Sequence, residues 1–88
     1  MRTADLCPIE NAPKDEWVCG ELVVHLPTHD TSRPRFFVYR GERDGVMKLE
    51  RASYDGKRRL LRLGKELDVP LHSRNEYVRV LRMRVVPC

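Results

Sequence analysis

Arginine and aromatic residues alternate closely in the middle of the chain, where Arg35 and Arg40 flank Phe37 and Tyr39. Single-stranded nucleic acid is bound by a groove of cations that meets the phosphates, together with aromatic rings on which bases stack. Arginine suits this task because its planar guanidinium makes paired hydrogen bonds to phosphate and also stacks on rings. We therefore predict a module that binds single-stranded DNA or RNA. The candidate nucleic-acid-binding residues are Arg35, Phe37, Tyr39, Arg40, Arg58, Arg62, Arg82 and Arg84.

The charge of the chain is divided unevenly, and this division leaves a second hypothesis open. Residues 1–32 hold two basic and six acidic residues, whereas residues 33–88 hold 15 basic and seven acidic ones. The basic part suits an anionic partner, but the acidic residues between 5 and 16 would repel phosphate. The alternative is a small regulator or inhibitor, of the type that phages and mobile elements encode, that docks on another protein. Exposed sheet edges would then allow strand addition or a homodimer.

Metal-binding and catalytic residue types are present, but their spacing favours neither chemistry. Cys7, Cys19, His25 and His29 leave 11, five and three residues between them, whereas structural zinc sites usually place paired cysteines about two to four residues apart. The sequence also lacks a Gly-rich phosphate loop, a Gly-x-Ser-x-Gly motif and a His-Glu-x-x-His motif. We therefore expect no enzyme, no catalytic residues, no metal site and no cofactor.

The cysteines and the hydropathy bear on where the protein works. Cys7, Cys19 and Cys88 form an odd and sparse set, which is not the pattern of a disulfide framework and predicts a reducing, cytoplasmic setting. Charges and Pro8 interrupt the N-terminus too early for a signal peptide. No stretch approaches the ~18–20 apolar residues that span a membrane, so we expect no membrane contact.

Strands are the elements predicted to carry these residues. In the first predicted strand, residues 17–26, four apolar residues share one parity, with Gly20 filling a gap between them, and this places them on one face. Further strands are predicted for residues 35–40, 46–54 and 77–86, with turn signals between them. Prolines interrupt residues 1–15, which are expected to form an irregular acidic arm. The domain organisation is therefore this arm followed by a single β-rich domain over residues 16–88.

Residues 57–67 fit two structures and decide the fold class. As a helix, Leu60, Leu63 and Leu67 share one face, although Gly64 weakens a helix interior by about 1 kcal/mol. The helix is the preferred interpretation. It gives a mainly β fold, a small antiparallel five-stranded barrel in an OB-like order, β-β-β-α-β-β, whose fourth strand is short. If these residues form a strand, the alternative is an SH3-like all-β barrel, and an open α+β sheet is a further alternative.

Overall fold

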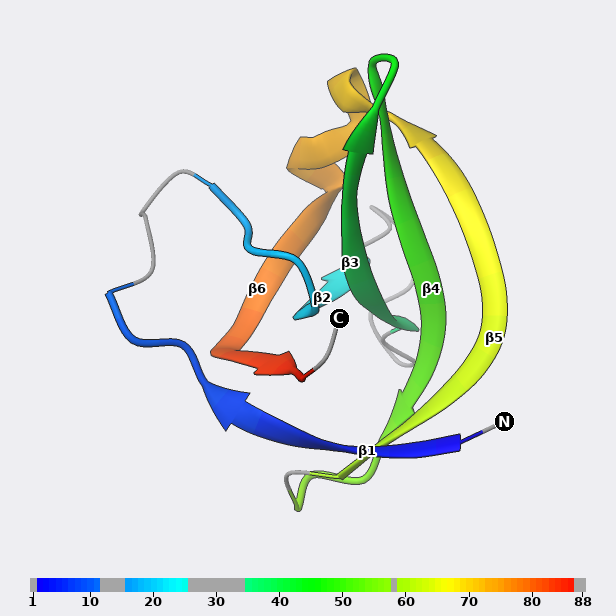
Figure 1. Cartoon of the computed structure of the whole chain (residues 1–88). Helices are drawn as coiled ribbons and strands as arrows, with labels where there is room; N and C mark the ends of the chain where they lie inside the picture. Colours follow the sequence, from blue (N-terminus) through cyan, green and yellow to red (C-terminus); the bar gives the residue numbers. More distant parts are fainter. Residues whose placement is uncertain (1, 12–15, 26–34, 58, 87–88) are drawn as a thin grey trace.

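The computed structural model describes residues 2–11, 16–25, 35–57 and 59–86 of the 88-residue chain (Figure 1). Within these ranges the chain forms strands and one short 3-10 helix. They are β1 (Arg2–Pro8), β2 (Glu21–His25), β3 (Arg35–Arg43), β4 (Val46–Tyr54), β5 (Arg59–Pro70), the 3-10 helix η1 (Leu71–Glu76) and β6 (Tyr77–Val85). None of these ranges contains a helix that is long and apolar enough to cross a membrane.

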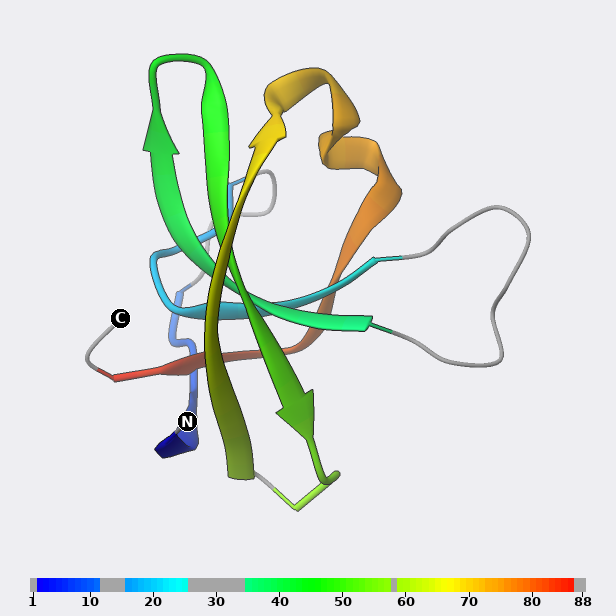
Figure 2. The ribbon, with the colours of Figure 1, turned by 90° about the vertical axis from the view of Figure 1, so that its right-hand side faces the viewer.

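The strands pair in antiparallel fashion and close into a barrel in the order β1-β5-β4-β3-β2-β6, with β6 returning to β1. Strands β2 to β5 form a meander in which each strand lies beside the next. The 3-10 helix then carries the chain across the end of the barrel, so that β6 runs beside β2 (Figures 1 and 2). The prediction of a small, mainly β barrel is confirmed.

The N-terminal residues contribute a strand to this barrel, so the prediction of an irregular arm is wrong for Arg2–Pro8. Residues 2–5 pair with β5 and residues 6–8 pair with β6, which makes β1 the strand that closes the barrel. Leu6 is only 4% exposed, and Ala4 packs against the same core. Pro8 is the last residue of the strand, and the next backbone N–H, that of Ile9, donates to the Arg82 carbonyl oxygen at 2.9 Å. The barrel therefore has six strands and not the predicted five.

Residues 57–67 do not form the predicted helix, because most of them belong to β5. This strand pairs with β4 along nearly its whole length, so its backbone groups are satisfied between strands. Gly64 has a φ angle of +76°, which glycine adopts readily and which an α-helix excludes. It lies where the register between β4 and β5 shifts, as at a β-bulge. The helical order is therefore wrong, and the all-β alternative describes the fold.

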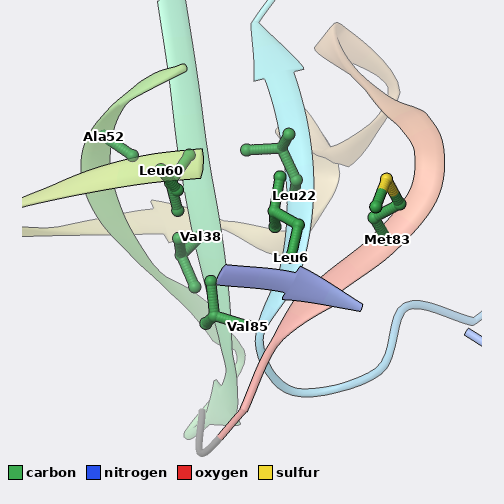
Figure 3. Close-up of a cluster of buried hydrophobic side chains, with 7 residues drawn as sticks. All are labelled: Leu6, Leu22, Val38, Ala52, Leu60, Met83 and Val85. Atoms are coloured by element: carbon green, nitrogen blue, oxygen red, sulfur yellow. The ribbon is translucent and has the colours of Figure 1, made fainter. Parts of the chain in front are cut away.

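Two clusters of buried side chains cover opposite faces of the central strands. The barrel core draws on all six strands and contains Leu6, Leu22, Val38, Ala52, Leu60, Met83 and Val85 (Figure 3). The outer core contains Val23, Phe37, Tyr39, Met47 and Leu49, with Trp17, Val69 and Tyr77 packed against it. Consecutive residues of a strand, such as Leu22 and Val23, point to opposite faces. The sheet formed by β2, β3 and β4 is therefore covered on both sides.

The cysteines differ from the interpretation drawn from their number. Cys19 is disulfide-bonded, whereas Cys7 is exposed and free. The sparse set therefore includes a disulfide-bonded cysteine, which its number did not indicate. Count and spacing along the chain do not show which thiols meet in space, since a disulfide depends on the distance between the two backbones. The cysteines consequently no longer support a reducing compartment.

Candidate functional site

Three residues of the predicted nucleic-acid-binding set are buried. Phe37 is 3% exposed and Tyr39 is 7% exposed, and both rings belong to the outer core. Arg62 is 2% exposed, and its guanidinium contacts another buried side chain, Glu50. In this arrangement neither ring is available to stack on a base, because both faces of β3 are covered.

The exposed arginines of the same set lie in separate parts of the barrel. In the strand register, Arg35 on β3 lies opposite His25 at one end of β2. Arg84 on β6 lies opposite Glu21 at the other end. Four residues of a strand span roughly 13 Å, so the backbones of these two arginines are too far apart for both to contact the same phosphate group. Arg82 accompanies Arg84 near the end of β6.

Arg40 and Arg62 are the two predicted cations that the fold does bring together. Both contact the same carboxylate, that of Glu50. Arg62 lies opposite Arg2 on β1, whereas Arg84 lies opposite Cys7, five residues or roughly 16 Å along that strand. The remaining predicted cation, Arg58, lies outside the residues that the structure describes. Among the predicted cations that the structure describes, Arg40 and Arg62 are thus the two joined by a common carboxylate.

Glu50 is the centre of this local pair. Its carboxylate accepts hydrogen bonds from Nε and Nη2 of Arg62 at 3.1 and 2.6 Å, from the Gly64 backbone N–H at 3.2 Å and from Arg40 Nη1 at 3.4 Å. Burial alone would raise the pKa of the Glu50 carboxyl, but the hydrogen bond and charge of Arg62, helped by Gly64 and Arg40, lower it overall. Glu50 is therefore a charged group that fixes two guanidiniums in place.

A hollow of about 270 Å³ opens beside this ion pair, and we call it the Arg62 hollow. Its lining residues are Arg2, Arg40, Glu50, Arg62, Gly64 and Glu66. They come from β1, β3, β4 and β5, so the hollow exists only because the barrel closes through β1. Three guanidiniums face two carboxylates there, which leaves an excess of positive charge.

A second arrangement of polar groups anchors the segment that precedes β2. Glu21 is fully buried, and its carboxylate lies 2.6 Å from Nε of Arg79 on β6. The same carboxylate accepts a hydrogen bond from the Val18 backbone N–H at 3.0 Å, and Arg79 also donates to the Glu16 carbonyl oxygen. These contacts hold Trp17 against the outer core, where its ring meets the Tyr39 ring edge-on at 5.4 Å.

The anchored tryptophan lines a second hollow, of about 350 Å³, which we call the Trp17 hollow. Its lining residues are Glu16, Trp17, Tyr39, Glu42 and Arg74. The Arg74 guanidinium lies over the Trp17 ring, 4.9 Å from its centroid, in a cation–π contact. Burial, followed by the negative charge of Glu42, raises the pKa of the Tyr39 hydroxyl, so Tyr39 is a neutral wall of the hollow. Rings and carboxylates together make a surface that suits a cation.

Of the residues that line the Trp17 hollow, Sequence analysis selected Tyr39 and missed the other four. Trp17 was predicted to open the first strand, although β2 begins later, at Glu21. Arg74 and Glu42 lie outside the strands predicted for residues 35–40, 46–54 and 77–86. The one available signal was the pair formed by Glu16 and Trp17, an acidic residue beside the single tryptophan. Nothing in the local pattern linked this pair to residues 39–42 or to Arg74.

Comparison with protein-family models, with curated proteins and with solved structures finds no match for this chain. The two hollows are therefore interpreted from their own chemistry. Across the residues that the structure describes, no three or more His, Cys, Asp or Glu side chains gather in a way that could hold a metal ion.

Proposed function

We propose that this protein is a non-enzymatic interaction module that docks on another protein, and that the Trp17 hollow receives a basic side chain of that partner. The observation that carries the proposal is the position of Arg74, whose guanidinium already lies over Trp17 in this hollow. The resident guanidinium acts as a stand-in for the incoming group. A cation over a tryptophan ring is worth roughly 0.5–1 kcal/mol when exposed and about 2 kcal/mol when desolvated.

The charge of the lining supports a basic partner over a nucleic acid. Glu16 and Glu42 face the hollow and attract a cation, whereas a phosphate placed there would be repelled by both. The burial of the Phe37 and Tyr39 rings gives the nucleic-acid hypothesis less support. Because the barrel is closed, we expect docking through side chains and not through addition of a strand to a sheet edge.

Trp17 is the single tryptophan of the chain, so its fluorescence reports directly on this hollow. The test is a titration with two five-residue glycine peptides, capped at both ends, that carry arginine or glutamine at the centre. The arginine peptide is expected to change Trp17 emission in a saturable way, and the glutamine peptide is not. Arg74→Ala is expected to raise the affinity for the arginine peptide, because it removes the resident cation.

A matched pair of carboxylate variants separates a specific effect from general attraction. Glu42→Gln removes a charge that lines the hollow. It should lower the affinity for the arginine peptide by roughly two- to fivefold, the range for an exposed ion pair. Glu10→Gln removes an exposed charge that does not line the hollow and should leave the affinity unchanged. The proposal fails if the arginine peptide does not change the fluorescence emission of Trp17. Tight binding of single-stranded DNA with a steep salt dependence would favour the nucleic-acid hypothesis in its place.

A further inference from the structure

The Arg62 hollow shares no residue with the Trp17 hollow and has the opposite character. A ligand in the Arg62 hollow would therefore bind independently of the proposed docking function. Arg2, Arg40 and Arg62 reach this hollow from three different strands, and two carboxylates, Glu50 and Glu66, accompany them. The formal balance of the lining is one positive charge.

Two of these arginines are placed unfavourably with respect to each other. Arg2 on β1 is the direct cross-strand partner of Arg62 on β5. Like charges directly opposite each other destabilise an antiparallel pair. Glu50 compensates Arg62, and Arg40 lies near both Glu50 and Glu66. Arg2, in contrast, makes no ion pair with any residue inside the described ranges. A third charge of opposite sign in the hollow would remove this repulsion.

We propose that the Arg62 hollow binds a phosphate group, with Arg2 and Arg40 as its direct ligands. Both side chains are exposed enough to turn toward a ligand, and a guanidinium contacts phosphate oxygens through parallel hydrogen bonds. Arg62 lies behind them in a buried ion pair with Glu50, which fixes the floor of the hollow. The phosphate comes either from a free anion or from the end of a nucleotide chain, and the site chemistry is the same for both.

The probe is inorganic phosphate, added at constant ionic strength to the whole protein, with the Gly64 amide followed by NMR. This amide donates to Glu50 and lines the hollow, so a ligand there must shift its resonance. Phosphate at about five times its Kd is expected to raise Tm by roughly 4–8 °C for a domain of this size. An oligonucleotide with a 5′-phosphate and the same oligonucleotide without it distinguish a nucleic-acid source from the free anion.

Arg2→Gln gives the sharpest variant because two effects of opposite sign are expected. Without phosphate, the variant should have a higher Tm than the wild type, since the repulsion between Arg2 and Arg62 is gone. With phosphate, it should lose most of the ligand-dependent rise. Arg51→Gln makes the same charge change at an exposed residue of β4 that does not line the hollow, and it should keep the full response. Exclusion of phosphate from protein surfaces stabilises every variant alike, so it cancels in this comparison.

The result that supports the site is a saturable shift of the Gly64 amide that is present in wild type and Arg51→Gln and weakened in Arg2→Gln. A shift with free phosphate alone assigns the site to a small anion, and a shift with the 5′-phosphorylated oligonucleotide assigns it to a nucleotide end. The proposal is overturned if no probe shifts Gly64, or if Arg2→Gln and Arg51→Gln respond equally.

Discussion

Glu50 illustrates how one residue can hold a strand irregularity and a charge cluster together. Its carboxylate binds a buried guanidinium, an exposed guanidinium and the backbone amide of the residue at the bulge. A buried carboxylate is stable in its charged form only when such partners replace the lost water. The pair of Glu50 and Arg62 is therefore costly to form and more costly to break, since removing one partner leaves the other charge buried.

Glu50→Gln tests this role, because it removes the charge and keeps the shape. We expect the free energy of unfolding, measured with urea at neutral pH, to fall by about 3–5 kcal/mol. Glu66→Gln is the matched control. Its carboxylate is 47% exposed and 3.9 Å from Arg40, so its loss should cost at most about 1 kcal/mol. Equal losses in the two variants would show that the buried position of Glu50 has no energetic consequence.

The pH dependence of the same residue has a defined sign. The pKa of Glu50 is lower in the folded protein than its ordinary value of 4.5. Its contribution to stability is then fully present above 4.5 and is lost as the pH falls through the folded-state pKa. The difference in unfolding free energy between wild type and Glu50→Gln should therefore shrink as the pH falls below 4.5. A difference that stays constant to lower pH would contradict the ion-pair account.

At the scale of elements, β5 shows pairing prevailing over local propensity. Its leucines recur with a helical spacing, but its neighbour β4 offers backbone partners along most of its length. The pairing of β5 with β4 shifts its register next to Gly64. The φ angle of this glycine is +76°, which is costly for other residues. Bulges of this kind also increase the local bend of a strand, which helps a small sheet to close.

Gly64→Ala is expected to lower the free energy of unfolding by about 1–2 kcal/mol, the cost of a left-handed backbone for an L residue. Space is not the reason, because an added Cβ would meet nothing within 4 Å. Lys65→Ala changes the next residue, which is exposed. The free energy of unfolding of this variant should stay within about 0.5 kcal/mol of the wild-type value. If urea unfolding shows the same midpoint for both variants, the positive φ at Gly64 is not a constraint on β5.

At the scale of the whole molecule, the two cores share the same strands. Leu22 and Val38 belong to the barrel core, and their neighbours Val23 and Phe37 belong to the outer core. Loss of pairing between β2 and β3 would therefore expose both clusters at once. This shared sheet predicts that the domain unfolds in one cooperative step.

The test compares two probes of urea unfolding. Trp17 fluorescence reports the outer core, and far-ultraviolet circular dichroism reports the strands of the barrel. The two transitions are expected to coincide. Leu60→Ala, which changes the barrel core alone, should destabilise the protein by about 2–5 kcal/mol and move both transitions together. The outer core would unfold independently if the two transitions were separate, or if Leu60→Ala left the midpoint of the Trp17 transition unchanged.

The candidate sites were less accessible to prediction than the fold. The arginine-rich pattern pointed to Arg40 and Arg62, which do meet, and also to Arg35 and Arg84, which do not. Period-two alternation also places every second residue of a strand on the same face, but it does not say whether the other face is covered. For this reason the rings of Phe37 and Tyr39, predicted for contact, lie in the outer core.

The sequence by itself determined the strands β3, β4 and β6 and the mainly β class, because alternation and turn residues act between close neighbours in the chain. The tertiary structure alone decided that residues 59–70 form a strand, that residues 2–8 close the barrel, and which charges meet. Arg62 meets Glu50 on the preceding strand and Arg2 on the first strand of the chain. The free energy of such contacts depends on burial and on pairing partners, and neither quantity is present in any local stretch of the chain.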